Sequence, residues 1–387
     1  MIMPSLGSRT TSVSNEMKNF ELPPYPYDLL NPYRDIAANY NGGLIDLSVG
    51  TPCDPPPNSV IEKLSMSENE RSYPKSVGSE EYLNACREWL VRRLHVRSDD
   101  TKHIAGCIGT KEFVASVPRD LRLKYPEKDT VLYPAVSYPS YAMGASLAGC
   151  RAVPVPVDDQ SRLDLGKVKD EDVKRALLLW VNSPSNPTGV LEDTQSLVHW
   201  GRSNNVPIFS DECYIEFTWN DNPSSVLHNG NQGVVAVHSL SKRSNLAGLR
   251  AGFYAGDADL VQWLSEVRKH AGKMIPGPVQ SASVIAWEDD LHVDRQRAIY
   301  EKRLALLVDL FRKLGYQVDK PEGAFYLWAK CEGYTSWDMV SDLAERFGVI
   351  VTPGDFFGDS CTENVRVAAV QPDQIIAELG ERFIGDL

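Results

Sequence analysis

The sequence predicts an α/β protein, with a mostly parallel sheet covered by helices and a smaller α+β domain after it. Between residues 57 and 290, short apolar runs alternate with helical patterns. This alternation is typical of parallel strands joined by helices. Three runs, at 177–181, 206–210 and 234–237, lead directly into polar residues that could take part in binding or catalysis. Ligands bind at the carboxyl ends of strands in such sheets, so we expect the functional site there.

The remaining elements follow from shorter patterns. A long amphipathic helix is expected over 295–314, because Leu304, Leu307, Val308 and Phe311 share one helical face. Short apolar runs predict further strands at 45–49, 103–107, 131–133, 152–155, 251–254, 325–328 and 365–367. We therefore divide the chain into a flexible tail (1–21), a segment joining the small domain (22–56), a large ligand-binding domain (57–290) and a small C-terminal domain (291–387).

Composition excludes several classes of protein. The chain has 387 residues, of which 42% are hydrophobic, enough for a large core. A net charge of −12 disfavours a nucleic-acid-binding surface, which would need a basic face. No apolar run has the length of a signal peptide or a membrane span, so we expect a cytoplasmic enzyme. Seven cysteines are scattered singly without metal-ligand spacing, so we expect neither a disulfide framework nor a metal site.

Lys242 lies just beyond the apolar run at 234–237. Ser239 precedes it by three residues and Arg250 follows it by eight, which supplies a hydroxyl and a guanidinium suited to a phosphate. A lysine removed from water can lose its proton and form a Schiff base, the linkage by which proteins hold pyridoxal phosphate. A lone lysine is more often a surface residue in a polar turn, so Lys242 gains its meaning only from the other motifs.

The ends of two other predicted strands carry residues that could bind the ring of the same cofactor. Asn186 lies in a turn rich in proline and glycine after the run at 177–181, while Asp211 and Tyr214 follow the run at 206–210. An ionised Asp211 would keep a pyridinium nitrogen protonated, which makes the ring an electron sink. Asn186 and Tyr214 could donate to the ring's phenolate oxygen and favour its ionised form. Singly, these residues also fit a turn residue, a helix N-cap and a core aromatic.

Together these motifs resemble the fold-type I, pyridoxal phosphate-dependent aminotransferases of class I and II. The resemblance extends from about residue 22 to the C-terminus. Within that class, the chain is most similar to N-succinyldiaminopimelate aminotransferases of the actinobacterial kind. The phrases that suggest this narrower likeness are DLSVGTP at 46–52, IGTKE at 108–112, NSPSNPTG at 182–189, HSLSK at 238–242 and RKHAG at 268–272.

A phosphate site is predicted where the run at 103–107 turns into a helix. Gly109 and Thr110 would present free backbone N–H groups there, although an ordinary helix cap has the same pattern. The resemblance adds Lys111 and Ser241 to the cofactor-binding set and assigns Tyr73 to the phosphate of a neighbouring subunit's cofactor, which implies a homodimer. Tyr138 is expected to stack on the pyridine ring, with Tyr141 in that place or a plain core role for Tyr138 as the alternatives.

Arg366 is the expected partner of the substrate α-carboxylate, because its planar guanidinium can donate two parallel hydrogen bonds. By family position it is helped by Gly50 and Asn186. The resemblance implies transamination between glutamate and N-succinyl-2-amino-6-oxopimelate, with Lys242 as general base and acid and with Asp211 and Tyr214 as further catalytic residues. Cations for the two distal carboxylates remain open among Arg34, Lys75, Lys111 and Lys273.

Other functions stay possible within the same fold. These are an aspartate, aromatic or direct diaminopimelate transaminase, or a pyridoxal phosphate-dependent C–S lyase. A regulator built on an aminotransferase fold is disfavoured, because about twenty polar residues before the fold leave no room for a DNA-binding domain. A survey of amino donors and oxo acceptors would separate the enzymatic alternatives.

Overall fold

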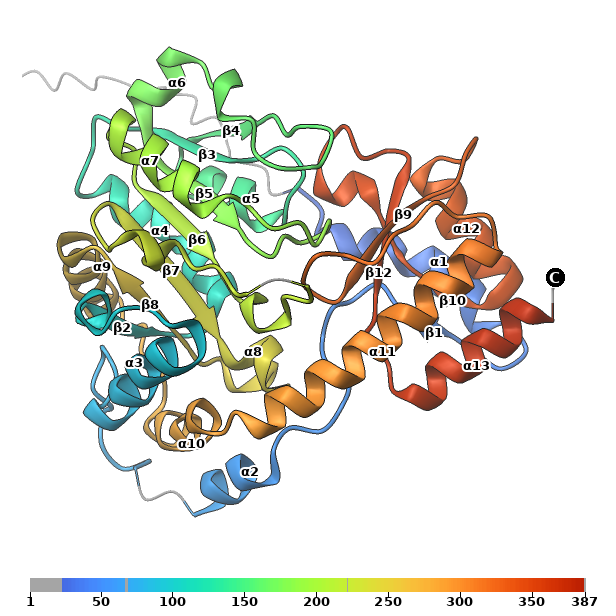
Figure 1. Cartoon of the computed structure of the whole chain (residues 1–387), viewed down its shortest axis with the longest axis horizontal. Helices are drawn as coiled ribbons and strands as arrows, with labels where there is room; N and C mark the ends of the chain where they lie inside the picture. Colours follow the sequence, from blue (N-terminus) through green and yellow to red (C-terminus); the bar gives the residue numbers. More distant parts are fainter. Residues whose placement is uncertain (1–22, 67–68, 221, 386–387) are drawn as a thin grey trace, which may run out of the picture.

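The structure is a computed structural model that describes residues 23–66, 69–220 and 222–385. The predicted flexible tail at 1–21 lies outside the described residues. Most of the chain forms two bodies side by side, a larger one around a twisted sheet and a smaller one near the C-terminus (Figure 1). The bounds proposed for the domains stay a prediction, although the two bodies agree with a large and a small unit.

The larger body contains a seven-stranded sheet with the order β2-β8-β7-β6-β5-β3-β4. Strand β8 runs antiparallel to both of its neighbours, and the other pairs are parallel. This confirms the predicted mostly parallel sheet. Its strands are β2 (Ile104–Cys107), β3 (Thr130–Pro134), β4 (Arg151–Val155), β5 (Ala176–Asn182), β6 (Ile208–Asp211), β7 (Val234–Ser239) and β8 (Gly252–Gly256).

Helices cover both faces of this sheet. One face packs against α4 (Thr110–Arg122), α5 (Ser140–Leu147) and α9 (Ala258–His270). The other packs against α3 (Glu80–Leu94), α7 (Thr194–Asn204) and α10 (Gly277–Glu288). Within β7, Val235 and Val237 face the first layer, whereas Val234 and Ala236 face the second. Burial on both faces explains why these strands read as continuous apolar runs.

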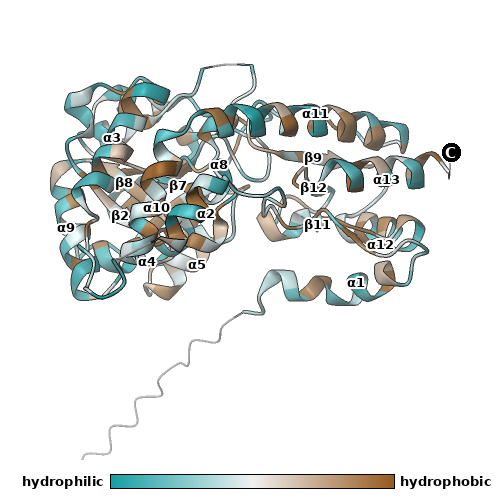
Figure 2. Cartoon of the chain, turned by 90° about the horizontal axis from the view of Figure 1, so that it is seen from below, coloured by the Kyte–Doolittle hydropathy of each residue, from teal (hydrophilic) through white to brown (hydrophobic). Residues whose placement is uncertain are grey.

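The smaller body is built around an antiparallel sheet with the order β11-β12-β9. The N-terminal segment contributes β1, which pairs in parallel with β10 and so joins this body. Figure 2 shows α11 extending along both bodies. The elements of the smaller body are α1 (Asn31–Ala38), β1 (Ile45–Asp46), β9 (Tyr326–Lys330), α12 (Ser336–Phe347), β10 (Val349–Ile350), β11 (Thr352–Pro353), β12 (Asn364–Ala368) and α13 (Asp373–Ile384), with α11 (Leu291–Lys313) alongside. Helix α2 (Asn58–Ser65) packs against α10 of the larger body.

The predicted apolar face of α11 is confirmed, because Leu304, Leu307, Val308 and Phe311 are all buried. Three predicted strands are shorter than expected, and β2 loses one residue by starting at Ile104. Strand β6 starts only at Ile208, since Pro207 has no N–H to donate to a neighbouring strand. Strand β1 stops at Asp46.

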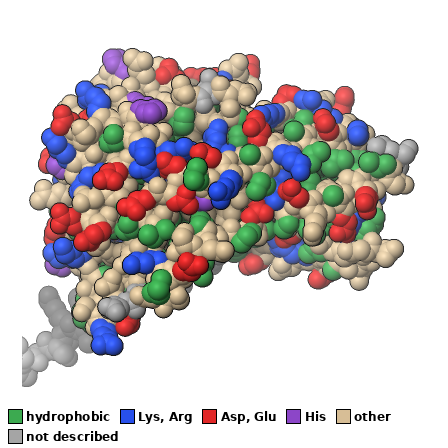
Figure 3. Space-filling view, turned by 60° about the horizontal axis from the view of Figure 1, so that its bottom comes forward, with side chains coloured by type: hydrophobic (Ala, Val, Ile, Leu, Met, Phe, Trp, Pro, Cys, Tyr) green, Lys and Arg blue, Asp and Glu red, His purple; other side chains and the backbone are tan. Residues whose placement is uncertain are grey.

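The surface agrees with the charge balance of the sequence. On the face shown in Figure 3, acidic and basic side chains are interspersed. Within the described part of the chain, no helix is both long and apolar enough to cross a membrane. The same residues contain no cluster of three or more His, Cys, Asp or Glu side chains placed to hold a metal ion.

Candidate active site

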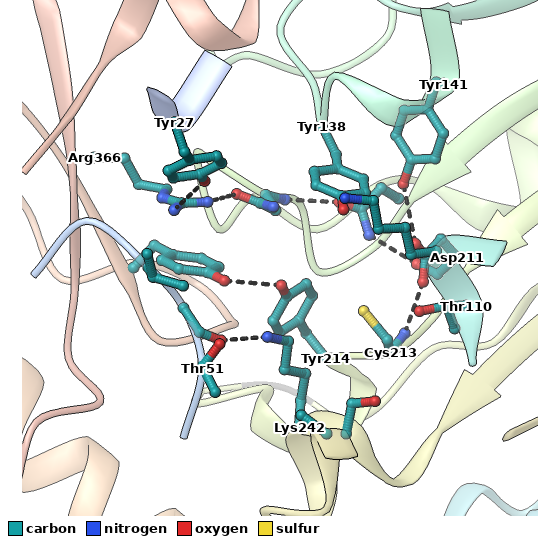
Figure 4. A pocket seen from close by; sticks show the side chains of 18 of the residues that line it. Tyr27, Thr51, Thr110, Tyr138, Tyr141, Asp211, Cys213, Tyr214, Lys242 and Arg366 are labelled. Carbon is teal, nitrogen blue, oxygen red and sulfur yellow. Dashed lines mark hydrogen bonds between the residues drawn. The ribbon is translucent and has the colours of Figure 1, made fainter. Parts of the chain in front are cut away.

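The carboxyl ends of β5, β6 and β7 lie next to one another in the sheet. They border a cavity of about 520 Å³ between the two bodies. The side chains of Asp211, Tyr214, Lys242 and Arg366 surround one space there (Figure 4). The cavity is lined by Tyr25, Tyr27, Val49, Gly50, Thr51, Thr110, Lys111, Tyr138, Tyr141, Asn182, Asn186, Asp211, Cys213, Tyr214, Ser241, Lys242, Ala247, Arg250, Tyr326 and Arg366.

Lys242 reaches this cavity from α8 (Leu240–Arg243), a single helical turn that follows β7. Its Nζ donates a hydrogen bond to the backbone oxygen of Gly50. Burial lowers the pKa of Lys242 from its ordinary 10.5 to about 8, because the charged amine is removed from water. Lys242 is therefore not the surface lysine of a polar turn, and its amine is poised to act as a nucleophile or base.

Asp211 is the last residue of β6 and is buried. Its carboxylate accepts hydrogen bonds from the Cys213 backbone N–H (3.2 Å) and the Tyr141 hydroxyl (3.3 Å). Burial raises the pKa of this carboxyl, while these hydrogen bonds oppose the rise. No described Lys, Arg or His side chain lies within ion-pair distance of Asp211. It does not cap a helix, so the carboxylate is left for a cationic partner from the cavity.

Tyr214 and Asn186 also face the cavity. The Tyr214 hydroxyl lies 2.9 Å from that of Tyr326, which belongs to β9. Asn186 is held by its backbone N–H, which donates to Oδ1 of Asn182 at 2.7 Å. The Asn182 amide in turn donates to the backbone oxygen of Asp211 at 2.8 Å. This network ties the ends of β5 and β6 together.

The predicted phosphate residues gather at the start of α4. Gly109 has φ +88°, and a Cβ there would lie 2.3 Å from Nη2 of Arg250. Glycine is therefore required for the guanidinium to approach the helix start. Thr110, Ser241 and Arg250 line the cavity, and the Ser239 hydroxyl lies behind them, donating to Ser241 Oγ at 2.7 Å. Hydroxyls, a guanidinium and a helix N-terminus form a place suited to a phosphate.

Arg366 stands at the opposite end of the cavity, on β12. Its Nη1 donates to Asn186 Oδ1 at 2.8 Å, and its Nη2 donates to the Tyr27 hydroxyl at 3.0 Å and to the Ser48 backbone oxygen at 2.5 Å. Its buried Nε has no hydrogen-bond partner among the described residues. A buried guanidinium without a carboxylate partner is suited to bind a substrate carboxylate.

Both tyrosines considered for stacking on the pyridine ring line the cavity. Tyr138 lines it, and Tyr141 lines it while donating its hydroxyl to Asp211. Tyr141 also stacks on Trp180, with ring centroids 5.4 Å apart and planes at 22°. The choice between Tyr138 and Tyr141 as the stacking residue stays a prediction.

The structure distinguishes among the four cations considered for the distal carboxylates of the substrate. Lys111 lines the cavity, where its Nζ donates to the Tyr25 hydroxyl at 3.3 Å. Arg34 pairs with Asp46, and Lys273 pairs with Glu112 at 3.0 Å. Neither these two residues nor Lys75 lines the cavity.

Tyr73 is also absent from this cavity and is 98% exposed. An exposed tyrosine outside the site of its own chain is compatible with a role at a partner's site. Lys75 and Tyr73 border a separate surface pocket.

Several cavity residues were not singled out from the sequence. Tyr27 and Tyr25 come from the N-terminal segment, Tyr326 from β9 and Cys213 from the loop after β6. Cys213 lies inside the motif from Asp211 to Tyr214, so its position in the cavity could have been predicted from the sequence. Nothing in the sequence marked the three tyrosines, because ordinary core and surface tyrosines look the same.

The residues of this cavity fit pyridoxal phosphate. The carboxylate of Asp211, which has no described cationic partner, would meet the ring nitrogen, and Lys242 would hold the aldehyde carbon. The start of α4 at Gly109, together with the Arg250 guanidinium, would bind the phosphate. Fold and site therefore define a fold-type I, pyridoxal phosphate-dependent enzyme. Residues 43–383 match the family of class I and II aminotransferases, and the chain belongs to that family.

Curated relatives support this assignment over almost the whole chain. The 4-dedimethylamino-4-oxo-anhydrotetracycline transaminase OxyQ of Streptomyces rimosus is 40% identical, covering 94% of this chain and 99% of that protein. An LL-diaminopimelate aminotransferase of Aquifex aeolicus is 33% identical, covering 94% and 96%. A solved structure of a probable N-succinyldiaminopimelate aminotransferase from Thermus thermophilus superposes with a TM-score of 0.83 at 26% identity, covering 94% and 100%.

Proposed function

We propose that this transaminase moves the amino group of glutamate to N-succinyl-2-amino-6-oxopimelate, a step towards diaminopimelate and lysine. The observation that carries the proposal is that Lys242 and Arg366 line one cavity, Lys242 from the larger body and Arg366 from the smaller one. A substrate held there by its α-carboxylate would place the neighbouring carbon towards the lysine. The likenesses to diaminopimelate aminotransferases and to the Thermus thermophilus structure support the choice of acceptor.

Each residue has a defined task in this proposal. Lys242 would hold the cofactor through its amine and, once freed by the amino donor, would move the proton at the substrate Cα as general base and acid. When bound, pyridoxal phosphate supplies the electron sink that takes up the charge of that deprotonation. Asp211 keeps the ring nitrogen protonated. Asn186 and Tyr214 donate to the ring oxygen, and Arg366 orients the carboxylate with help from Gly50 and Asn186.

A second group of residues would bind the phosphate and one face of the cofactor ring. We assign the phosphate to the start of α4 and to the turn that follows β7, and one pyridine face to Tyr138. A homodimer would bring Tyr73 of the partner subunit to the same phosphate, which its exposure in this chain allows. The proposed phosphate residues are Gly109, Thr110, Lys111, Ser239, Ser241 and Arg250.

A second candidate acceptor is a large cyclic ketone. The likeness to OxyQ, whose name describes a transaminase of an oxo-anhydrotetracycline, favours this candidate. The cavity wall also offers the rings of Tyr25, Tyr27 and Tyr138, which suit a flat ring system. Lys111 adds a cation beside them, which suits either a distal carboxylate or an ionised ring oxygen.

The decisive experiment compares kcat/KM for acceptors with glutamate as the donor. N-succinyl-2-amino-6-oxopimelate should exceed oxaloacetate and phenylpyruvate by a large factor, because remote binding energy can be used to orient the reacting carbon. A ratio near one, or one that favours the short acids, would contradict the proposed acceptor. LL-diaminopimelate with 2-oxoglutarate and an anhydrotetracycline ketone should be assayed in parallel.

A further inference from the structure

A pair of tyrosine hydroxyls lies at the edge of the active-site cavity. The oxygens of Tyr214 and Tyr326 are 2.9 Å apart, and both side chains are buried. Tyr214 follows β6 in the large sheet, whereas Tyr326 begins β9 in the small one, so their hydrogen bond joins the two bodies. Burial raises the pKa of Tyr214 well above its usual range and that of Tyr326 to about 12, so both hydroxyls keep their protons at neutral pH.

The surroundings of Tyr326 hold its hydroxyl at this point. The guanidinium carbon of Arg366 lies 4.3 Å from the centre of the Tyr326 ring. The Tyr214 and Phe325 rings pack against it with centroids 5.6 and 5.0 Å away. A Cβ on Gly50 would lie only 1.9 Å from the Tyr326 oxygen, so the bare backbone of Gly50 is what gives the hydroxyl room to reach Tyr214.

The number of protons restricts what this pair can do. Each tyrosine hydroxyl has one proton to donate and can also accept. The contact between them uses one of the two protons, so one is left to donate elsewhere. If Tyr214 donates to the ring oxygen of the cofactor, its own proton is committed there. The contact with Tyr326 can then form only if Tyr326 is the donor.

We propose that Tyr326 is a positioning residue whose hydroxyl donates to the Tyr214 oxygen and so directs the Tyr214 proton towards the cofactor's ring oxygen. The proposal rests on the function proposed above for Tyr214. A hydroxyl that accepts a hydrogen bond becomes a stronger donor in a buried chain. Tyr326 therefore helps Tyr214 to stabilise the ionised ring oxygen, and thereby the deprotonated form of the nitrogen that joins Lys242 to the cofactor.

The test is a pH titration of the visible absorption of the cofactor-loaded protein in the absence of substrate. Tyr214→Phe should raise the midpoint pH, because the ionised ring oxygen loses a donor. Tyr326→Phe removes a single oxygen atom and should also raise the midpoint, by up to about 0.5 pH unit. A shift of this size corresponds to part of the free energy of one hydrogen bond. The double variant should titrate like Tyr214→Phe alone, because Tyr326 acts through Tyr214.

Tyr254→Phe is the matched control. It also removes one buried tyrosine hydroxyl, but from a residue of β8 that does not line the cavity, and its titration should match that of the unaltered protein. Tyr326→Leu gives a second variant that lacks the Tyr326 hydroxyl, and it should also raise the midpoint. This variant keeps the idea testable if Tyr326→Phe fails to fold.

The outcomes separate the inference from the function on which it rests. An unchanged midpoint in folded Tyr326→Phe, with a raised one in Tyr214→Phe, would overturn the role of Tyr326 alone. Additive shifts in the double variant would overturn it too, because Tyr326 would then act on the cofactor directly. An unchanged midpoint in Tyr214→Phe would remove the proposed role of Tyr214, and the inference with it.

Discussion

Nη1 of Arg366 donates to Oδ1 of Asn186 at 2.8 Å, although the two residues are 180 positions apart and belong to different bodies of the protein. Asn186 follows β5 of the large sheet, and Arg366 lies on β12 of the small one. The contact therefore places the proposed carboxylate-binding residue against a residue of the proposed cofactor site. A substrate carboxylate bound to Arg366 would lie beside Asn186.

The assignment of Lys242 predicts a coloured protein. Purified with pyridoxal phosphate, the protein should be yellow, and Lys242→Ala should lose that absorption, because Lys242 is the cavity lysine whose pKa burial lowers. After reduction with borohydride, mass spectrometry of the unaltered protein should locate the cofactor on Lys242. Recovery of the adduct on Lys111, the other lysine that lines the cavity, would show that the assignment is wrong.

The lowered pKa of Lys242 predicts a pH dependence for the apo-protein. Because only the neutral amine attacks an aldehyde, the rate of pyridoxal phosphate uptake should rise with pH through a midpoint near 8. The sign follows from burial, which favours the uncharged amine and so moves its deprotonation to lower pH. Stopped-flow absorbance measures this rate. A midpoint near the ordinary lysine value of 10.5 would contradict the buried setting of the amine.

Asp211→Ala should retain the fold but lose most of the transamination rate. A missing electrostatic partner of this kind costs on the order of 10²–10³ in kcat, by analogy with the loss of oxyanion-hole donors. Circular dichroism and cofactor absorption would confirm that the variant is folded and loaded. Asp211→Glu is the matched control, since it keeps the charge and should retain more activity than the alanine variant. Near-normal turnover of loaded Asp211→Ala would give the residue a structural role only.

Arg366→Lys should harm every amino-acid substrate alike. Lysine cannot donate two parallel hydrogen bonds to a carboxylate, and the loss of one charge-assisted bond costs roughly 10- to 100-fold in kcat/KM. The measurement is kcat/KM for glutamate, aspartate and phenylalanine as donors. If the loss were confined to one donor, Arg366 would not be the group that binds the shared α-carboxylate.

With pyridoxal phosphate at saturating concentration, Lys111→Ala should weaken acceptors with a distal negative charge more than acceptors without one. Lys111 is the one candidate distal cation, among the four considered, that lines the cavity, and a partly exposed ion pair of this kind changes KM by roughly 2- to 5-fold. Lys273→Ala is the control, because Lys273 pairs with Glu112 and does not line the cavity. If Lys273→Ala alone raised KM for the long acceptor, the distal site would have been misplaced.

Local patterns in the sequence were enough to predict much of the fold and of the cofactor site. The runs that became β5, β6 and β7 are continuous and apolar because helices bury both faces of the sheet. Asn186, Asp211 and Lys242 follow the ends of these strands, and parallel neighbours bring such ends together. Their adjacency therefore followed from spacing along the chain.

Only the tertiary structure decided which residues complete the site. Tyr27 and Tyr326 enter the cavity from the side of the small body, and their places depend on how that body packs against the large sheet. Within the larger body, α4 lies beside the segment after α9, so Lys273 pairs with Glu112 and does not line the cavity. A local pattern reports the face on which a side chain lies but not the partner across a domain boundary, because that partner is set by long-range packing.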